Sequence, residues 1–362
     1  MQIPFFSKQS EPLLGIDIGS SSVKIVELSK SGTEIKVQSA GTFPLPPNTI
    51  VEGRIDNVEA LALTLQRAIQ KLRTKAKHVA IAVPGSAVIT RVLEMPAGLS
   101  DNEMESQLLL EAEQYIPYSL DEVAIDFAVL DTDSDEEDNE DEEAQRRTKV
   151  LLVACRKEST DALLALIEGA DLEAKIIDVE PFCLERVYPL LAEQLEEDSD
   201  SLIAVVDCGA TNLRVNVLDK GSTVYSREEL FGTRQLNEEI QRRYGLSHEE
   251  ALTAEREGGL PGDYEQEVLV PFRESLIQQI SRSLQFFYSS TSYSHVDGII
   301  LGGGIIAQPE IVRLTEAKIE LPVVAANPFS HMQLGPRVDK RALKEIAPSL
   351  LIATGLALRG VT

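Results

Sequence analysis

The chain has 362 residues, of which 43% are hydrophobic, and its formal net charge is -25. This length is more than one hydrophobic core usually serves, so two domains are expected. The negative charge argues against nucleic acid or an anionic lipid surface as a direct partner.

Residues 1–12 are polar apart from Ile3, Phe5 and Phe6. A frayed terminus is the simpler interpretation. The alternative is that these side chains contact the domain or a partner.

The stretch 14–28, LGIDIGSSSVKIVEL, predicts a β-hairpin. An apolar strand leads into a turn of glycine and serine, and alternating apolar residues mark the returning strand. Asp17 stands beside the turn at 19–22, where hydroxyls and backbone N–H groups can converge on an anion. Lys24 lies on the returning strand. The hairpin therefore predicts a phosphate cradle, with an ordinary tight turn as the alternative.

The hairpin pattern recurs at 204–218, AVVDCGATNLRVNVL. Aligning the two stretches sets Asp17 on Asp207, and it also sets Lys24 on Arg214. Two copies suggest two similar domains that face each other across a cleft and offer both turns to one ligand. A polyphosphate with its metal ion fits, because glycines allow close approach and Mg2+ prefers oxygen ligands, usually through water.

After the first hairpin, 34–43 predicts a third strand and Val58–Leu72 a helix with one apolar stripe. A new unit begins at His78. It starts with two strands, the second of which ends at Pro96. A helix follows that is capped by Ser100 and Glu103 and ends after Ile116. The later elements are strands at Val123–Leu130 and 149–155, a helix at 160–170 and a strand at 175–178. These elements predict a small sheet with two helices.

Ten of the thirteen residues at 131–143 are acidic. Such a run cannot pack against itself, so a disordered hairpin loop is expected. The alternative is a site for cations or a basic partner.

Two later features are candidates for the ligand site. Glu180 starts a helix just before the second hairpin, either as a capping acid or as a third acid for the cleft. The strand Gly298–Leu301 then runs into three glycines and a helix. Those glycines let the backbone lie against a bulky ligand, or simply allow a tight strand-to-helix turn. The closing helix carries small residues on its packing faces, at Ala353, Gly355 and Ala357.

Cysteine usage and hydropathy indicate the compartment. The cysteines are Cys155, Cys183 and Cys208, far apart in apolar segments and without metal-ligand spacing, which indicates free thiols in a reducing compartment. The start lacks the features of a signal peptide, and no run approaches the roughly 18 apolar residues of a membrane span. We expect a cytoplasmic protein.

Five stretches resemble, in order, the motifs of the actin-like ATPase superfamily. GIDIGSSSVK resembles its first phosphate motif, VVDCGATN the second and LGGG the adenosine motif, while the helices at Glu180 and Ala353 resemble its connecting segments. Within that superfamily, the insert from His78 to Ala170 with its QYIPY, and the closing GLALR, resemble the PilM family of type IV pilus assembly proteins, which are relatives of the cell-division protein FtsA.

The resemblance implies an α/β, two-lobed, actin-like fold of the duplicated ribonuclease H-like type, with an FtsA-type inserted subdomain. The first lobe would span 1–197, with a core of 10–77 and 174–197 joined by 346–362, and an inserted subdomain at 78–173. The second lobe would span 198–345, with a core of 198–232 and 295–345 and a helical subdomain at 233–294.

ATP and Mg2+ would lie in the cleft between the lobes. The implied nucleotide contacts are Gly19, Ser20, Ser21, Ser22, Lys24, Gly209, Ala210, Thr211, Asn212, Gly302, Gly303 and Gly304. Asp17, Glu180 and Asp207 would hold the hydrated metal, and Glu180 and Asp207 are also the candidates for a catalytic role. Many relatives carry a Lys or Glu near the ribose, for which this chain offers Glu250, Glu255 and Arg256.

The implied function is an ATP-binding cytoplasmic scaffold of the pilus inner-membrane assembly complex, with slow ATPase activity at most. It would reach the membrane through the membrane protein PilN, whose N-terminal cytoplasmic peptide would dock where the insert meets the first lobe, along the helix at 105–118. Other inner-membrane pilus components are further expected partners, and homo-oligomerisation stays open.

Two alternatives remain. A small-molecule kinase of the superfamily would need a further Asp base. A filament-forming, FtsA-like division protein would need an amphipathic tail, whereas this chain ends at Thr362 directly after the last predicted helix.

Overall fold

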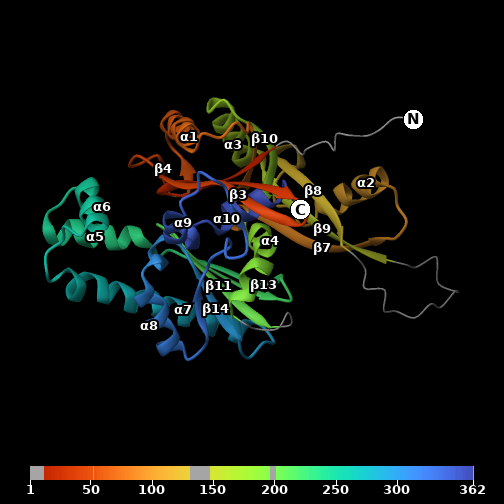
Figure 1. Ribbon diagram of the computed structural model, residues 1–362. Helices are drawn as coiled ribbons and strands as arrows, with labels where there is room; N and C mark the ends of the chain where they lie inside the picture. Colours follow the sequence, from red (N-terminus) through yellow and green to blue (C-terminus); the bar gives the residue numbers. More distant parts are fainter. Residues whose placement is uncertain (1–11, 52, 131–146, 196–200, 362) are drawn as a thin grey trace. The chain divides into compact units, whose positions relative to one another are not determined.

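The computed structural model describes residues 12–51, 53–130, 147–195 and 201–361. The expectations for the N-terminal aromatic side chains and for the acidic run at 131–143 lie outside these residues. The chain forms two compact units (Figure 1). One is Val83–Ala165, and the other is built from the chain on either side, up to Ala82 and from Leu166.

Six strands form the first sheet of the larger unit, counted over the described residues, in the order β10-β6-β1-β2-β3-β16. Their bounds are β1 Leu13–Ile18, β2 Ser22–Ser31, β3 Glu34–Pro44, β6 His78–Val83, β10 Glu173–Val179 and β16 Gln333–Leu334. A small ribbon, β4 (Ile50–Val51) with β5 (Arg54–Ile55), follows β3. Helix α1 spans Val58–Leu72, as predicted, and buries Leu61 and Leu65.

A second sheet of the same unit has the order β13-β12-β11-β14-β15 within the described ranges. Its strands are β11 Leu202–Cys208, β12 Leu213–Asp219, β13 Ser222–Glu229, β14 Gly298–Gly302 and β15 Val323–Ala325. Helices α7 (Val270–Ser290) and α8 (Pro309–Ile319) lie beside this sheet (Figure 1). The apolar stripe of α7, which includes Leu276, Ile280, Leu284 and Phe287, is buried in the core against the strands.

Helices α5 (Thr233–Tyr244) and α6 (His248–Glu257) contact each other. A π-helical turn at Glu265–Leu269 then leads into α7. These helices form an insertion between β13 and β14, here called the helical lobe.

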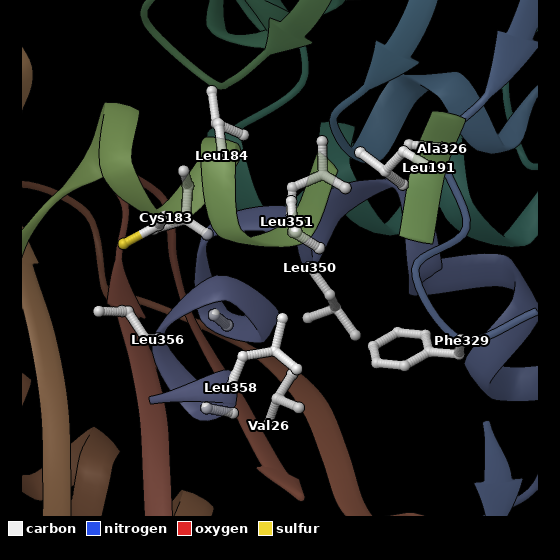
Figure 2. Packing of buried hydrophobic residues seen from close by; sticks show 14 of the residues in the cluster. Val26, Cys183, Leu184, Leu191, Ala326, Phe329, Leu350, Leu351, Leu356 and Leu358 are labelled. Atoms are coloured by element: carbon white, nitrogen blue, oxygen red, sulfur yellow. The ribbon is translucent and has the colours of Figure 1, made fainter. Parts of the chain in front are cut away.

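Two helices join the sheets through a shared core. Helix α4 (Glu180–Ala192) packs against α10 (Leu351–Leu358), with α9 (Lys340–Ile346) nearby. Figure 2 shows Leu184 and Leu191 of α4 in the same cluster as Leu351, Leu356 and Val26. Close backbone packing explains the small residues of α10, since a Cβ on Gly355 would lie 2.2 Å from the carbonyl oxygen of Cys183. The prediction of close-packing faces on this helix is confirmed.

The unit Val83–Ala165 contains a three-stranded sheet in the order β7-β9-β8. The strands are β7 Val88–Pro96, β8 Val123–Leu130 and β9 Arg147–Arg156, and α2 (Asp101–Ala112) covers one face. Helix α3 (Lys157–Gly169) follows. It starts three residues before the predicted helix, which makes the connection from β9 shorter than expected.

The predicted end of α2 was wrong. The helix ends at Ala112 and not after Ile116, because the carbonyl of Ala112 accepts from the N–H groups of both Tyr115 and Ile116 and closes a turn. Pro117 disfavours the helical conformation for the residue before it. The turn carries Ile116 back into the core but leaves Tyr115 40% exposed.

Candidate functional site

The two hairpins have the same register. Asp17 faces Lys24 across β1 and β2, and Asp207 faces Arg214 across β11 and β12. Their turns are also alike, because the N–H of Gly19 donates to the Ser22 carbonyl at 3.0 Å and that of Gly209 to the Asn212 carbonyl at 2.9 Å. The repeat predicted from the sequence is therefore a structural repeat of strand, turn and strand.

The two turns touch each other. Ser20 Oγ and Thr211 Oγ1 lie 3.0 Å apart, within hydrogen-bond distance. Asn212, predicted as a ligand contact, donates its side-chain amide to Glu228 on β13. The hydroxyls of the turns are thus near one another, while the amide of Asn212 already has a partner.

The ammonium group of Lys24 pairs with the acid of the first hairpin, Asp17. Lys24 Nζ donates to Asp17 Oδ2 at 2.8 Å, and Asp17 is 7% exposed. Burial acts to lower the pKa of Lys24, but the negative charges of Asp17 and Asp207 outweigh it and raise the pKa. Lys24 is therefore held as a cation between acids from the two hairpins.

In the second hairpin, the guanidinium of Arg214 takes the place that Lys24 has in the first. Arg214 lies 3.2 Å from Glu180, 3.3 Å from Glu228 and 3.9 Å from Asp207, measured between charged atoms. The neighbouring acids raise its pKa despite burial. No role was predicted from the sequence for the pair Arg214 and Glu228, although a cross-strand register between them could have indicated one.

The three acids predicted as metal ligands lie in one electrostatic cluster. Burial raises the pKa of Glu180 to about 7, Arg214 opposes this shift, and the charges of Asp17 and Asp207 add to it. Burial also raises the pKa of Asp207. Glu180 Oε2 is buried; Arg214 lies 3.2 Å from this oxygen and forms an ion pair with it, but no described residue donates a hydrogen bond to it. Across the described residues, no group of three or more His, Cys, Asp or Glu side chains is arranged to hold a metal ion directly.

The glycine turn lies next to the second hairpin. Gly302 is the strand partner of Asp207, and a Cβ on it would lie 2.7 Å from Leu351 Cδ1. Gly303 has a φ of 107°, and its Cβ would lie 2.1 Å from the Cys208 carbonyl oxygen. A Cβ on Gly304 meets nothing within 4 Å. Contact with the Cys208 backbone thus requires glycine at 303, Gly302 packs against the end of the Leu351 side chain, and Gly304 faces open space.

A buried arginine links this turn to the helical lobe. Arg273 of α7, which is 6% exposed, donates to Glu265 at 2.5 Å and to Gln308 at 2.8 Å. Gln308 is the N-cap residue of α8 and follows the 3-10 turn Gly304–Ala307. No local pattern indicates this link, because Arg273 stands inside an apolar helix stripe and its partners come from other elements.

The three residues offered for the ribose have different surroundings. Glu250 closes the capping box of α6 with Ser247, and Arg256 pairs with Glu257 on the surface. Burial raises the pKa of Glu255. Of the three, Glu255 is the acid in a desolvated position.

Comparison with known proteins decides the family. A family model described as type IV pilus assembly protein PilM matches residues 15–361. The chain belongs to the PilM family. The match takes in both hairpins, the glycine turn and the inserted unit, so the resemblance noted in the sequence is confirmed.

Solved structures agree with this membership. A structure described as the PilM-PilN type IV pilus biogenesis complex is 30% identical over 98% of this chain and 99% of that one, with a TM-score of 0.77. The ethanolamine utilization protein EutJ from Carboxydothermus hydrogenoformans is 14% identical over 95% of this chain and 88% of that one, with a TM-score of 0.53, and shares the fold. The fold of this PilM family member is actin-like, as predicted. Its described helices include none long and apolar enough to cross a membrane.

Proposed function

We propose that this PilM family member is a scaffold of the type IV pilus inner-membrane assembly complex that binds Mg-ATP between its two hairpin turns. The observation that supports the nucleotide site best is the repeated hairpin with its turns in contact. Two glycine turns, each with an acid beside it and a cation across the strand, offer the groups that a polyphosphate and its metal ion require.

The phosphates would lie against the first turn, residues Gly19, Ser20, Ser21, Ser22 and Lys24, and against the second, residues Gly209, Ala210, Thr211 and Asn212. Serine and threonine hydroxyls can donate to phosphate oxygens. Lys24 and Arg214 would balance part of the negative charge. Asn212 would have to exchange its bond to Glu228 to take part.

A hydrated Mg2+ suits the acids better than a directly coordinated one. Asp17, Glu180 and Asp207 belong to one cluster, and Glu180 Oε2 lacks a hydrogen bond from any described residue. Mg2+ dehydrates reluctantly and is usually held by few carboxylates together with substrate phosphates. Glu180 or Asp207 would then orient a water molecule at the bound metal, and hydrolysis would be slow without an additional base.

The adenosine would lie at the glycine turn. Gly304 is next to open space, while Gly302 and Gly303 are fixed by packing. The Arg273 link to Gln308 would hold this turn in place relative to the helical lobe.

We further propose that the chain binds the N-terminal cytoplasmic peptide of PilN and so associates with the inner membrane, together with other pilus components. The support is the 30% identical structure described as a PilM-PilN complex. Within the unit Val83–Ala165, Leu110 of α2 is 72% exposed and Tyr115 is 40% exposed. These side chains would contribute apolar contacts to an extended peptide.

Calorimetric titration tests the nucleotide site. Mg-ATP should bind the wild-type chain, and Asp207→Asn should lower the affinity at least about tenfold, since it removes a charge that the metal requires. Asp219→Asn is the control, because Asp219 lies at the other end of the same hairpin, bonded to Tyr293. Equal affinity of the Asp207 and Asp219 variants would contradict the proposed site.

A synthetic PilN N-terminal peptide tests the second part. The affinity of the peptide should fall in the double variant Leu110→Ser, Tyr115→Ser. It should stay unchanged in Leu63→Ser, which alters an exposed leucine of α1. Unchanged binding in the double variant would show that the peptide does not bind at these two side chains.

A further inference from the structure

In each hairpin, the acid beside the turn faces a cation on the returning strand. Lys24 faces Asp17, and Arg214 faces Asp207. The two cations are not equivalent. Arg214 is shared among Glu180, Glu228 and Asp207, whereas Lys24 hydrogen bonds to Asp17 at 2.8 Å. A guanidinium in contact with three carboxylates is fixed by its planar fork, while an ammonium on a four-carbon stem can turn.

The position of the ammonium group adds a second observation. A Cβ built on Gly19 would lie 3.5 Å from Lys24 Nζ, so the ammonium already lies beside the first turn. From there it can contact either the carboxylate of Asp17 or an anion seated on the turn.

We infer that Lys24 is an exchangeable counter-ion that occupies the acid cluster in the ligand-free protein and passes from Asp17 to the phosphate groups when Mg-ATP binds. The inference deepens the proposed nucleotide site and rests on it. In the ligand-free protein, Lys24 neutralises Asp17 and repels a divalent cation from it. When the metal arrives with its phosphates, the metal replaces Lys24 as the positive charge at Asp17, and the ammonium gains phosphate oxygens as partners.

This exchange makes metal binding depend on the nucleotide. Bare Mg2+ would have to displace Lys24 without offering it a new anion, so MgCl2 alone should bind weakly. Mg-ATP supplies both the cation for Asp17 and the anion for Lys24. The ion pair between Asp17 and Lys24 would thus keep the site from loading with metal alone.

The test measures how tightly MgCl2 and Mg-ATP bind to Lys24→Met in the full chain. The two affinities should change in opposite directions. Without nucleotide, MgCl2 should bind Lys24→Met at least about tenfold more tightly than the wild type, because a repelling unit charge has been removed. Mg-ATP should bind the same variant about tenfold or more weakly, because a charged phosphate contact is lost. Calorimetry measures both, with NaCl matched for ionic strength.

Two further variants separate charge from structure. Lys24→Arg keeps the positive charge and should show weak binding of bare Mg2+ like the wild type. Lys30→Met removes an exposed cation from the same strand and should change neither affinity. If Lys24→Met does not fold, the wild type still tests the exchange. Tight binding of MgCl2 to the wild type without nucleotide would overturn it.

The outcomes distinguish this inference from the proposed site. If Mg-ATP binds the wild type but Lys24→Met leaves both affinities unchanged, the exchange is wrong and the nucleotide site stands. If Mg-ATP does not bind the wild type at all, both are wrong. Opposite shifts for MgCl2 and Mg-ATP support the exchange.

Discussion

Ser20 and Thr211, which come from different sheets, bring their hydroxyl oxygens to within 3.0 Å of each other. Each stands in the turn of one of the two repeated hairpins, so the contact ties the turns together. At the proposed nucleotide site, a ligand between the turns would have to replace this bond with bonds of its own. The contact would then compete with the ligand.

A double-mutant cycle measures this contact. Ser20→Ala and Thr211→Val each remove one hydroxyl, and the pair should show a coupling of about 1 kcal/mol in the free energy of unfolding. Chemical denaturation without ligand gives the values. Additive effects of the two substitutions would show that the hydroxyls do not interact in solution.

Gly303→Ala should destabilise the protein by about 2 kcal/mol or more. The backbone at Gly303 has a φ of 107°, and a Cβ would meet the Cys208 carbonyl at 2.1 Å. Gly304→Ala is the matched control, since its Cβ enters open space, and we expect it to leave the melting temperature nearly unchanged. Similar stability of the two variants would contradict the packing at this turn.

Glu180→Gln should change how stability depends on pH. The pKa of Glu180 is about 7 in the folded protein, above the ordinary value of 4.5. The folded state therefore binds more protons than the unfolded state between these values, and this group lowers stability as the pH rises from 4.5 to 7. Glutamine removes the effect.

The stability of Glu180→Gln relative to the wild type should thus rise between pH 5 and pH 8, by at most about 3 kcal/mol. Urea denaturation at both pH values gives the difference. Glu316→Gln, on the exposed face of α8, serves as the control. A relative stability that does not change with pH would show that Glu180 is not desolvated.

Arg273→Met should cost about 2 kcal/mol in the free energy of unfolding, because it removes hydrogen bonds made by a buried charged group. It should also weaken Mg-ATP binding if the link to Gln308 positions the glycine turn. Arg282→Met, on the exposed face of the same helix, should do neither. Equal stability of the two variants would show that the buried hydrogen bonds of Arg273 contribute nothing net.

The sequence predicted the hairpins well because a tight turn fixes the register of the strands it joins, so that the aligned acids and cations fall at matching positions. The motifs assigned Asp17 to the metal and Lys24 to phosphate. The register of the hairpin also places these two residues opposite each other. The link from Arg273 to Gln308 joins residues far apart in the chain, and such a contact leaves no local pattern. The end of α2 depends on a local turn at Ala112, which the apolar residues continuing to Ile116 concealed.

Helix α10 has a consequence for synthesis of the protein. Its backbone seats against β1 so closely that a Cβ on Gly15 would lie 2.0 Å from the Ala353 carbonyl oxygen. Strand β1 leaves the ribosome long before α10 does, so the apolar face of the first sheet stays uncovered through most of translation. We expect that face to be prone to aggregation until α10 emerges, and a chain that stops before Leu351 to be less stable than the full chain.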